Sequence, residues 1–278
     1  MPELNNLPIN ILVTLNEAYI PYLNVMLTSL LRSNPDNFFR VYLLHREVRS
    51  EALDTTRTLL WERGELIAVK IDDSRLSGAP TTSRYPTEIY YRIFAASFLP
   101  ESVGRVLYLD PDLIVNKSLA EFYNMPMSDY LFAAASHVRG LIRKVNEYRL
   151  DMDESDPYIN SGVMMNLTRL REVQDEGEVF NFIEEHRKTL ILPDQDIISG
   201  LYGPDIIPLD PYRYNMTERL YAAQLLLGRK LTPEWVREHS AIIHYCGRNK
   251  PWKPGYIGQL DVFWHEAATL TDGRISPM

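Results

Sequence analysis

The order of apolar and polar positions along the first part of the chain predicts alternating strands and helices. Ile9 to Leu15 is a short apolar run, and apolar residues then recur at helical spacing from Leu23 to Leu31. A second β-rich run spans Phe39 to Leu44, and a second helical pattern spans Glu51 to Trp61. A third strand runs from Leu66 to Ile71. Successive βα units of this kind favour a parallel sheet with crossover helices.

The middle of the chain continues the alternation after a polar stretch from Ser74 to Arg84. A helix is predicted to start near Pro86, because proline suits the first helical turn, and to carry Tyr90, Tyr91 and Arg92. The further elements are a fourth strand from Arg105 to Leu109, strands from Tyr130 to Ser136 and Gly162 to Leu167, a helix from Val138 to Leu150 between them, and a helix opening at Asp194.

The pattern weakens in the last part of the chain. Pro204 to Lys230 shows no clear period, and Ser240 to Tyr245 is a short predicted strand. We therefore predict an α/β fold, with residues 1–278 forming one domain whose C-terminal third, from about residue 204 to residue 278, is irregular.

Composition narrows the class of protein. The 278 residues are 45% hydrophobic, which is enough for a sizeable core and excludes a disordered or fibrous chain. The formal net charge of −8 argues against nucleic acid as a partner, because such binding depends on clustered Lys and Arg. A small anionic ligand would need a metal ion or a few local bases.

Cellular location is predicted from the single cysteine, Cys246, which cannot form an internal disulfide and fits the reducing cytoplasm. The start of the chain lacks a signal-peptide pattern, and no segment approaches the roughly 20 apolar residues of a membrane span. We expect the sequons at Asn116, Asn166 and Asn215 to be unused. The stretch from His265 to Met278 offers no apolar face for membrane attachment.

Candidate chemistry collects where ligands bind in open α/β sheets, beyond the carboxyl ends of the strands. Asn16, Asp72, Asp110 and Asp112 all follow predicted strands. Asp110 and Asp112 are two residues apart, so in extended chain both carboxylates face one side and can share a divalent cation. The alternative is an ordinary Asp-Pro-Asp turn.

The last predicted strand adds a nitrogen ligand to that pair. His244 stands near its end, although a single histidine is usually satisfied by ordinary hydrogen bonds. Two carboxylates with one imidazole favour Mn²⁺, with Mg²⁺ as the alternative ion. Lys250 can bring a positive charge to phosphates, or can simply be solvated, and Gly247 and Gly255 around it would allow a mobile flap.

The helix that opens at residue 194 begins with three polar side chains, Asp194-Gln195-Asp196. Their simplest interpretation is an ordinary N-cap, because aspartate is among the favoured capping residues. Their position in the chain, between the Asp pair and His244, allows a place in the same site.

These features together resemble glycosyltransferase family 8, the retaining enzymes that include bacterial lipopolysaccharide galactosyltransferases and glucosyltransferases and the glycogenins. The resemblance covers residues 9–252. It rests on five motifs in order, which are Tyr90-Tyr91-Arg92, Leu107-Tyr108-Leu109-Asp110-Pro111-Asp112, Asn160-Ser161-Gly162-Val163, Asp194-Gln195-Asp196 and His244-Tyr245-Cys246-Gly247-Arg248-Asn249-Lys250-Pro251-Trp252. The Asp-x-Asp element alone is short and common, whereas the histidine motif is much more specific.

The resemblance implies a GT-A fold, a Rossmann-like single domain with a mostly parallel sheet and flanking helices. It implies that Mn²⁺ is held by Asp110, Asp112 and His244. It also implies contacts of the loop from Asn16 to Tyr19 with uracil and ribose, of Arg92, Gly247 and Lys250 with the sugar and diphosphate, and of Asn160, Asp194 and Gln195 with the sugar pocket.

The loop Leu15-Asn16-Glu17-Ala18-Tyr19 departs from the family's usual acidic or amide-rich loop. Asn16 can still hydrogen-bond uracil and Tyr19 can still stack, so UDP remains the expected carrier. Family membership implies retention of configuration. Because an amide is a poor nucleophile, we expect same-face attack with Gln195 stabilising positive charge, while Asp194 holds a sugar hydroxyl.

The expected reaction moves glucose or galactose from a UDP-sugar to a saccharide, glycolipid or other acceptor, in the setting of bacterial cell-envelope polysaccharide synthesis. Two other functions stay open, a metal-dependent nucleotidyltransferase or phosphohydrolase, and a nucleotide-sugar-binding protein that has lost activity. No pattern in the sequence indicates the oligomeric state.

Overall fold

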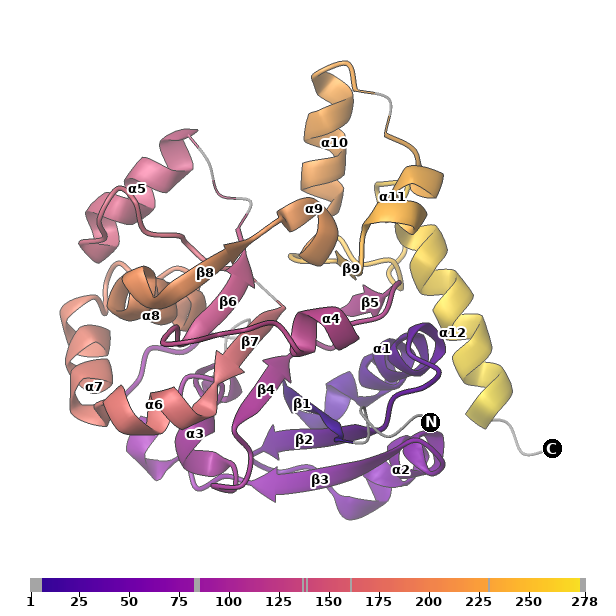
Figure 1. The fold of residues 1–278 in the computed structure, drawn as a ribbon, viewed down its shortest axis with the longest axis horizontal. Helices are drawn as coiled ribbons and strands as arrows, with labels where there is room; N and C mark the ends of the chain where they lie inside the picture. Colours follow the sequence, from indigo (N-terminus) through magenta and orange to yellow (C-terminus); the bar gives the residue numbers. More distant parts are fainter. Residues whose placement is uncertain are drawn as a thin grey trace.

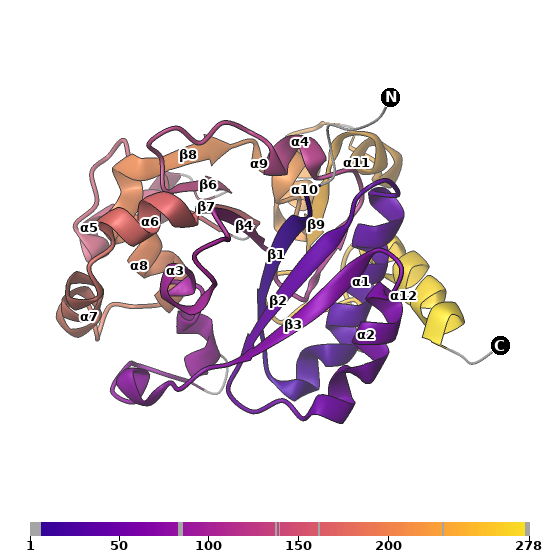
Figure 2. The same cartoon turned by 60° about the horizontal axis from the view of Figure 1, so that its bottom comes forward.

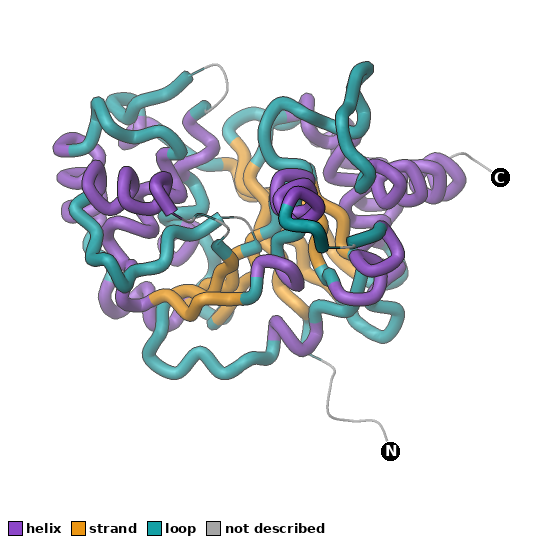
Figure 3. The backbone as a smooth tube through the Cα atoms, turned by 90° about the horizontal axis from the view of Figure 1, so that it is seen from above, coloured by secondary structure: helices purple, strands orange, loops and turns teal. Residues whose placement is uncertain are grey.

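The computed structural model describes residues 7–82, 86–136, 138, 140–160, 162–229 and 231–275. A seven-stranded sheet in the order β3-β2-β1-β4-β7-β6-β8 runs through the middle, with helices on either side (Figures 1 and 3). Its strands are β1 (Ile9–Thr14), β2 (Phe39–His45), β3 (Gly64–Lys70), β4 (Arg105–Tyr108), β6 (Phe132–Ala135), β7 (Val163–Asn166) and β8 (Ile206–Leu209).

The predicted βα units form one half of the sheet. Strands β1, β2 and β3 are parallel, and α1 (Ile20–Ser33) and α2 (Asp54–Leu60) connect them on one face, as Figure 2 shows. Side chains alternate across a strand. Ile11 and Val13 pack on the α1 side, whereas Leu12 belongs to the core on the opposite face. Each of these three strands begins or ends within two residues of its predicted limits.

The other half of the sheet is mixed. Strand β4 lies parallel to β1, but β7 is antiparallel to both β4 and β6, and β8 is again parallel to β6. The sheet as a whole is mostly parallel and has flanking helices, so the predicted fold class is confirmed. Helices on this half are α3 (Ala95–Phe98), α5 (Gly140–Leu150), α6 (Leu167–Val173), α7 (Glu176–Glu185) and α8 (Pro193–Tyr202).

A separate two-stranded sheet joins distant parts of the sequence. Strand β5 (Leu113–Val115) pairs antiparallel with β9 (Ile242–His244), so that Leu113 stands opposite His244. The backbone N–H of Tyr245 donates to the carbonyl of Asp112 at 3.0 Å. This pairing brings the Asp-Pro-Asp segment beside the histidine motif.

The predicted helix from Pro86 is wrong in form. Thr87–Tyr90 is a 3-10 helix, and Tyr91 and Arg92 lie in the turns that follow it. The i to i+3 hydrogen bonds Tyr91 N to Glu88 O and Ile93 N to Tyr90 O replace an α-helical ladder. Packing of the buried Tyr90, Tyr91 and Arg92 side chains prevails over the local helix signal.

The prediction of an irregular C-terminal third is also wrong. Besides β8 and β9, this region contains the helices α9 (Pro211–Tyr214), α10 (Glu218–Leu226), α11 (Pro233–His239) and α12 (Asp261–Ile275). Helix α4 (Ala120–Tyr123) lies earlier in the chain, between β5 and β6. The helices before α12 are too short to show a period in the sequence. Capping marks their starts instead, because Thr217 accepts from Leu220 N and Thr232 accepts from Trp235 N.

Short 3-10 segments complete the described structure, at Glu17–Tyr19, Ser50–Leu53, Ser74–Leu76 and Gly203–Asp205. Helix α12 packs along α1, with further contacts to α2 and β5. No helix in the described ranges has the length and apolarity that a bilayer crossing requires.

Candidate active site

A cavity of about 540 Å³ opens at the carboxyl ends of β1 and β4, and most of the candidate site residues line it. The predicted residues brought together there are Asn16, Tyr19, Arg92, Asp110, Asp112, Asn160, Asp194, Gln195, His244, Gly247 and Lys250. Asp72 is the exception among the strand-end carboxylates. It does not line this cavity and instead accepts a hydrogen bond from Ser74 N at 3.1 Å.

The carboxylates of Asp110 and Asp112 and the imidazole of His244 form a compact cluster. One ligand atom from each lies within 4.8 Å of the others, and His244 Nε2 is 3.3 Å from Asp112 Oδ1. Oxygen and imidazole nitrogen together are a donor set that suits a divalent transition ion such as Mn²⁺. The residues present therefore fit a divalent cation.

Asn215 orients the imidazole of His244. Its Oδ1 atom lies 3.1 Å from His244 Nδ1, and both side chains are buried. An amide oxygen accepts, so Nδ1 carries the proton and Nε2 is left as the ligand atom beside Asp112. A partner on the second ring nitrogen is the usual companion of a metal-binding histidine.

Lys250 is buried and forms an ion pair with the carboxylate of Asp112, so it is not the solvated lysine of the simpler interpretation. Its Nζ atom also donates to the carbonyl of Tyr245 at 2.7 Å. Burial alone would raise the pKa of Asp112, but the neighbouring His244 and Lys250 hold it well below its usual value. The carboxylate is therefore ionised, as a metal ligand must be.

Tyr108 and Thr14 support the first carboxylate from the sheet. The Tyr108 hydroxyl donates to Asp110 Oδ1 at 2.8 Å and lies 3.3 Å from Thr14 Oγ1. Burial, together with the charge of Asp110, raises the pKa of Tyr108 far above its ordinary value, so the phenol keeps its proton. The guanidinium carbon of Arg92 stands 4.6 Å above the Tyr108 ring.

Arg92 and Asp194 form a buried ion pair that also lines the cavity. The Nη2 atom of Arg92 lies 2.6 Å from Asp194 Oδ2, and both side chains are almost fully buried. Burial raises the pKa of Asp194 to about 6, Arg92 opposes this rise, and Asp110 adds to it. Arg92 Nε is buried without a hydrogen-bond partner among the described residues, which leaves a donor for a ligand oxygen.

The first turn of α8 presents Asp194 and Gln195 to the cavity. Leu192 occupies the N-cap position and Pro193 the first turn, so the capping interpretation of Asp194 is wrong. Gln195 Oε1 accepts from Asn160 Nδ2 at 3.3 Å. Ser161 of the same motif lies outside the described residues, and Gly162 adopts a φ of 74°, which favours glycine.

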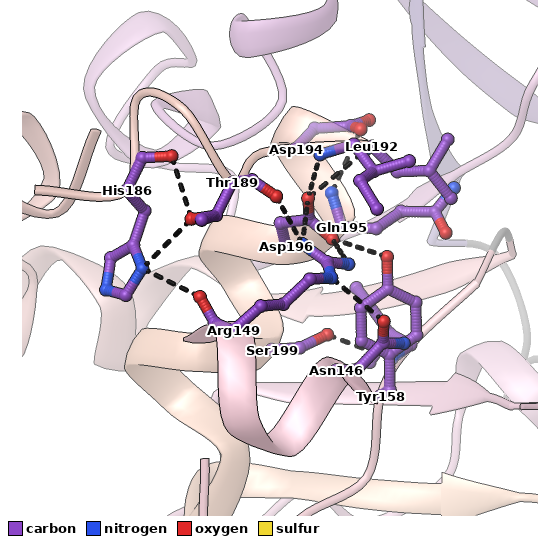
Figure 4. A network of polar contacts seen from close by, with 12 residues as sticks. Asn146, Arg149, Tyr158, His186, Thr189, Leu192, Asp194, Gln195, Asp196 and Ser199 are labelled. Atoms are coloured by element: carbon purple, nitrogen blue, oxygen red, sulfur yellow. Dashed lines mark hydrogen bonds and ion pairs between the residues drawn. The ribbon is translucent and has the colours of Figure 1, made fainter. Parts of the chain in front are cut away.

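Asp196 points away from the cavity into a buried network, which Figure 4 shows. Its carboxylate accepts from Arg149 Nη1 and Nη2 at 2.8 and 2.6 Å and from the Tyr158 hydroxyl at 2.6 Å. The backbone N–H groups of Ile191 and Leu192 donate to it as well. All of its acceptor positions are thus occupied, and the residue fixes the start of α8 against α5.

The loop after β1 contributes Asn16 and Tyr19 to the cavity lining. The Oδ1 atom of Asn16 is buried without a hydrogen-bond partner in the described part of the chain. Tyr19 is 38% exposed and packs edge-on against Tyr22 at 5.6 Å. The glycine of the histidine motif, Gly247, has a φ of 89°, a conformation that L-residues rarely adopt.

Sequence reasoning missed three groups at this site. The sequence indicated Asn215 only as part of a sequon and Tyr108 only as one residue of a motif. In the structure Asn215 hydrogen-bonds His244, and Tyr108 hydrogen-bonds Asp110. The third group is a set of exposed bases on the cavity rim. For Tyr108 its position two residues before Asp110, on the same strand face, was an available signal.

Comparisons with known proteins give one family match over most of the chain. The sequence model described as Glycosyl transferase family 8 matches residues 10–254. General stress protein A of Bacillus subtilis is 30% identical over 192 residues, which span 66% of this chain and 65% of that protein. A lipopolysaccharide 1,2-glucosyltransferase of Escherichia coli is 25% identical over 242 residues, covering 86% of this chain and 71% of that protein.

The fold has a close counterpart among solved structures. The crystal structure of the galactosyltransferase LgtC, in complex with donor and acceptor sugar analogues, superposes with a TM-score of 0.81. The two sequences are 21% identical, and the superposition covers 94% of this chain and 96% of the other. At this identity the likeness concerns the fold.

Proposed function

The chain belongs to glycosyltransferase family 8 and is a glycosyltransferase, and from that premise we propose that it transfers glucose or galactose from a UDP-sugar to a saccharide or glycolipid acceptor. The observation that carries the proposal is the cluster of Asp110, Asp112 and His244 on the floor of the cavity. The unpartnered Asn16 Oδ1 atom supports the choice of carrier, because uracil offers an N–H donor.

In this proposal Asp110, Asp112 and His244 hold Mn²⁺, which when bound would neutralise charge on the diphosphate leaving group. Mg²⁺ is the alternative ion. Lys250 and Gly247 bind the diphosphate, and Asn16 and Tyr19 bind the nucleoside. The burial of Lys250 supports its role, because a charge–charge contact strengthens where water is excluded.

The sugar end of the donor is assigned to Arg92, Asp194 and Gln195, which line the same cavity. Arg92, held over Tyr108 and paired with Asp194, offers its free Nε donor to a sugar oxygen. Asp194 accepts from a sugar hydroxyl, and Asn160 aligns Gln195 through the 3.3 Å hydrogen bond. Gln195 then stabilises positive charge at the anomeric carbon by its amide oxygen.

We propose retention of configuration by same-face attack. A covalent route would need a carboxylate nucleophile. Of the two buried carboxylates beside Gln195, that of Asp194 is paired with Arg92 and is assigned to a sugar hydroxyl. That of Asp196 already accepts from Arg149, Tyr158 and two backbone N–H groups. This saturation argues against Asp196 as the nucleophile. We further propose that residues 1–278 act as one GT-A domain, and that the reaction takes place in the cytoplasm, where the free Cys246 stays reduced.

Product analysis tests the proposal against its closest rival. Incubation with Mn²⁺ and UDP-sugars should release UDP, whereas a nucleotidyltransferase acting on a sugar phosphate and UTP would release pyrophosphate. Release of neither product, with no metal-dependent thermal stabilisation by UDP, would favour a protein that has lost activity.

A further inference from the structure

The rim of the cavity carries three bases that the donor assignment does not use, Arg219, Arg248 and Lys253. All three are exposed, whereas Arg92 and Lys250 are buried on the walls and floor. None of the three has a carboxylate within ion-pair distance among the residues that the structure describes. Unpaired bases gathered at one opening are unexpected in a chain of net charge −8.

The backbone beneath these bases is held in place. Thr217 caps the helix that carries Arg219, and Glu218 Oε1 accepts from Gln259 N at 2.9 Å, which ties the start of α10 to the loop after β9. Arg248 follows the turn at Gly247, and Lys253 N donates to the Lys250 carbonyl at 3.0 Å. The bases therefore stand on a capped helix and on turns beside the site.

Arg219 and Arg248 approach the cavity from two different elements. Arg248 lies in the histidine motif, two residues from Cys246, and Arg219 lies on α10. Both side chains nevertheless line the cavity to which Lys250 also contributes.

A count of charges shows what the rim adds. The cavity is lined by four acids, Glu88, Asp110, Asp112 and Asp194, and by five bases. A divalent ion and the diphosphate of a donor cancel each other. With the donor bound, the site therefore keeps an excess of positive charge, and the exposed part of that charge stands at the mouth, where a second substrate enters.

From this arrangement we infer that the acceptor is an anionic saccharide, one that bears a phosphate or a carboxylate bound by Arg219 and Arg248. The inference rests on the proposed glycosyl transfer and names its acceptor class. Guanidinium groups bind phosphate and carboxylate through paired N–H donors. The same bases would attract such an acceptor over a distance, more strongly at low salt.

Binding to the protein already loaded with Mn²⁺ and UDP tests the inference, because UDP then fills the diphosphate subsite. The probes are methyl glucoside and methyl galactoside, their 6-phosphates and the corresponding methyl uronides, measured by calorimetry. We expect the anionic probes to bind at least fivefold more tightly than the neutral ones. Comparison of the affinities for the 6-phosphates and for the methyl uronides shows which anion the site prefers.

The variants Arg219→Gln and Arg248→Gln should remove that preference and leave UDP affinity within twofold of the wild type, while Arg219→Lys should keep part of it. Arg237→Gln is the matched control, since Arg237 is an exposed arginine paired with Glu266 outside the cavity, and it should change nothing. Equal binding of charged and neutral probes, including no binding of either, would overturn the inference. A loss of UDP affinity in these two variants as large as their loss of affinity for the anionic probes would also overturn it.

The preceding titration with Mn²⁺ and UDP keeps the two proposals apart. If UDP fails to bind in the presence of metal, the proposed function itself is contradicted. If UDP binds normally and the anionic probes show no advantage, only the acceptor class is wrong.

Discussion

The Nδ1 atom of the His244 imidazole lies 3.1 Å from the Oδ1 atom of the Asn215 amide, and both side chains are buried. The contact fixes the tautomer, so the Nε2 atom of His244 faces Asp112 at 3.3 Å. The geometry of the Asp110, Asp112 and His244 cluster thus depends on a residue outside it. Such outer partners tune affinity because they hold the ligand in position.

Asn215→Ala should weaken Mn²⁺ binding by about 10- to 100-fold, since the imidazole then loses its orienting acceptor. Calorimetric titration with Mn²⁺ measures the effect. Asn215→Asp, which keeps an acceptor oxygen at the same place, serves as the control and should bind the ion more tightly than the alanine variant. Unchanged Mn²⁺ affinity in Asn215→Ala would show that the contact has no orienting role.

Gln195→Ala should lower the turnover number by about 10²-fold, the usual effect of removing one polar group that stabilises transition-state charge. Affinity for UDP and Mn²⁺ should stay the same, because Gln195 contacts Asn160 rather than the metal cluster. Steady-state kinetics with calorimetry of UDP binding separate the two effects. Near wild-type turnover would refute the role given to Gln195.

Asp194 should make stability depend on pH. Its pKa is raised to about 6, chiefly by burial, so folding favours the protonated carboxyl, and this contribution is lost as the pH rises through 6. The stability advantage of the wild type over Asp194→Asn should therefore be about 1.4 kcal/mol larger at pH 5 than at pH 7.5. Urea unfolding in chelator at both pH values measures it, and a pH-independent difference would contradict the assignment.

The Arg149–Asp196 pair should matter chiefly for stability. Arg149→Met leaves Asp196 buried without its two strongest donors, and should cost about 3–5 kcal/mol of unfolding free energy. The exposed pair Arg237–Glu266 provides the comparison, since Arg237→Met should cost less than about 1 kcal/mol. Equal losses in urea unfolding would mean that burial does not distinguish the two pairs.

The parts of the fold that could be predicted from the sequence are those with long, regular patterns. The apolar runs that became β1, β2 and β3 and the helical spacing of α1 are examples. The Asp110, Asp112 and His244 cluster was predicted too, because Asp-x-Asp follows a strand and the histidine motif is specific. Asp72 also follows a strand, but the chain turns at Ser74 and carries it away from the cavity.

The remaining features depend on contacts between distant, short segments. Strand β5 has three residues, too few for a period. Strand β9 lies within the predicted strand from Ser240 to Tyr245, but its pairing with β5, which places Asp112 beside His244, has no local signal. The 3-10 form of Thr87–Tyr90 follows from packing that local propensity does not reveal. The rim position of Arg219 depends on how α10 is attached to the loop after β9, which no local pattern indicates.

The most direct test of the central claim is UDP release from UDP-glucose and UDP-galactose, measured with Mn²⁺ and with chelator, for the wild type and for Asp112→Asn. Slow donor hydrolysis makes the test independent of the acceptor. We predict Mn²⁺-dependent release from one of the two sugars by the wild type, and loss of that release in chelator and in the variant. Release that is the same with and without metal, or that persists in Asp112→Asn, would contradict the account.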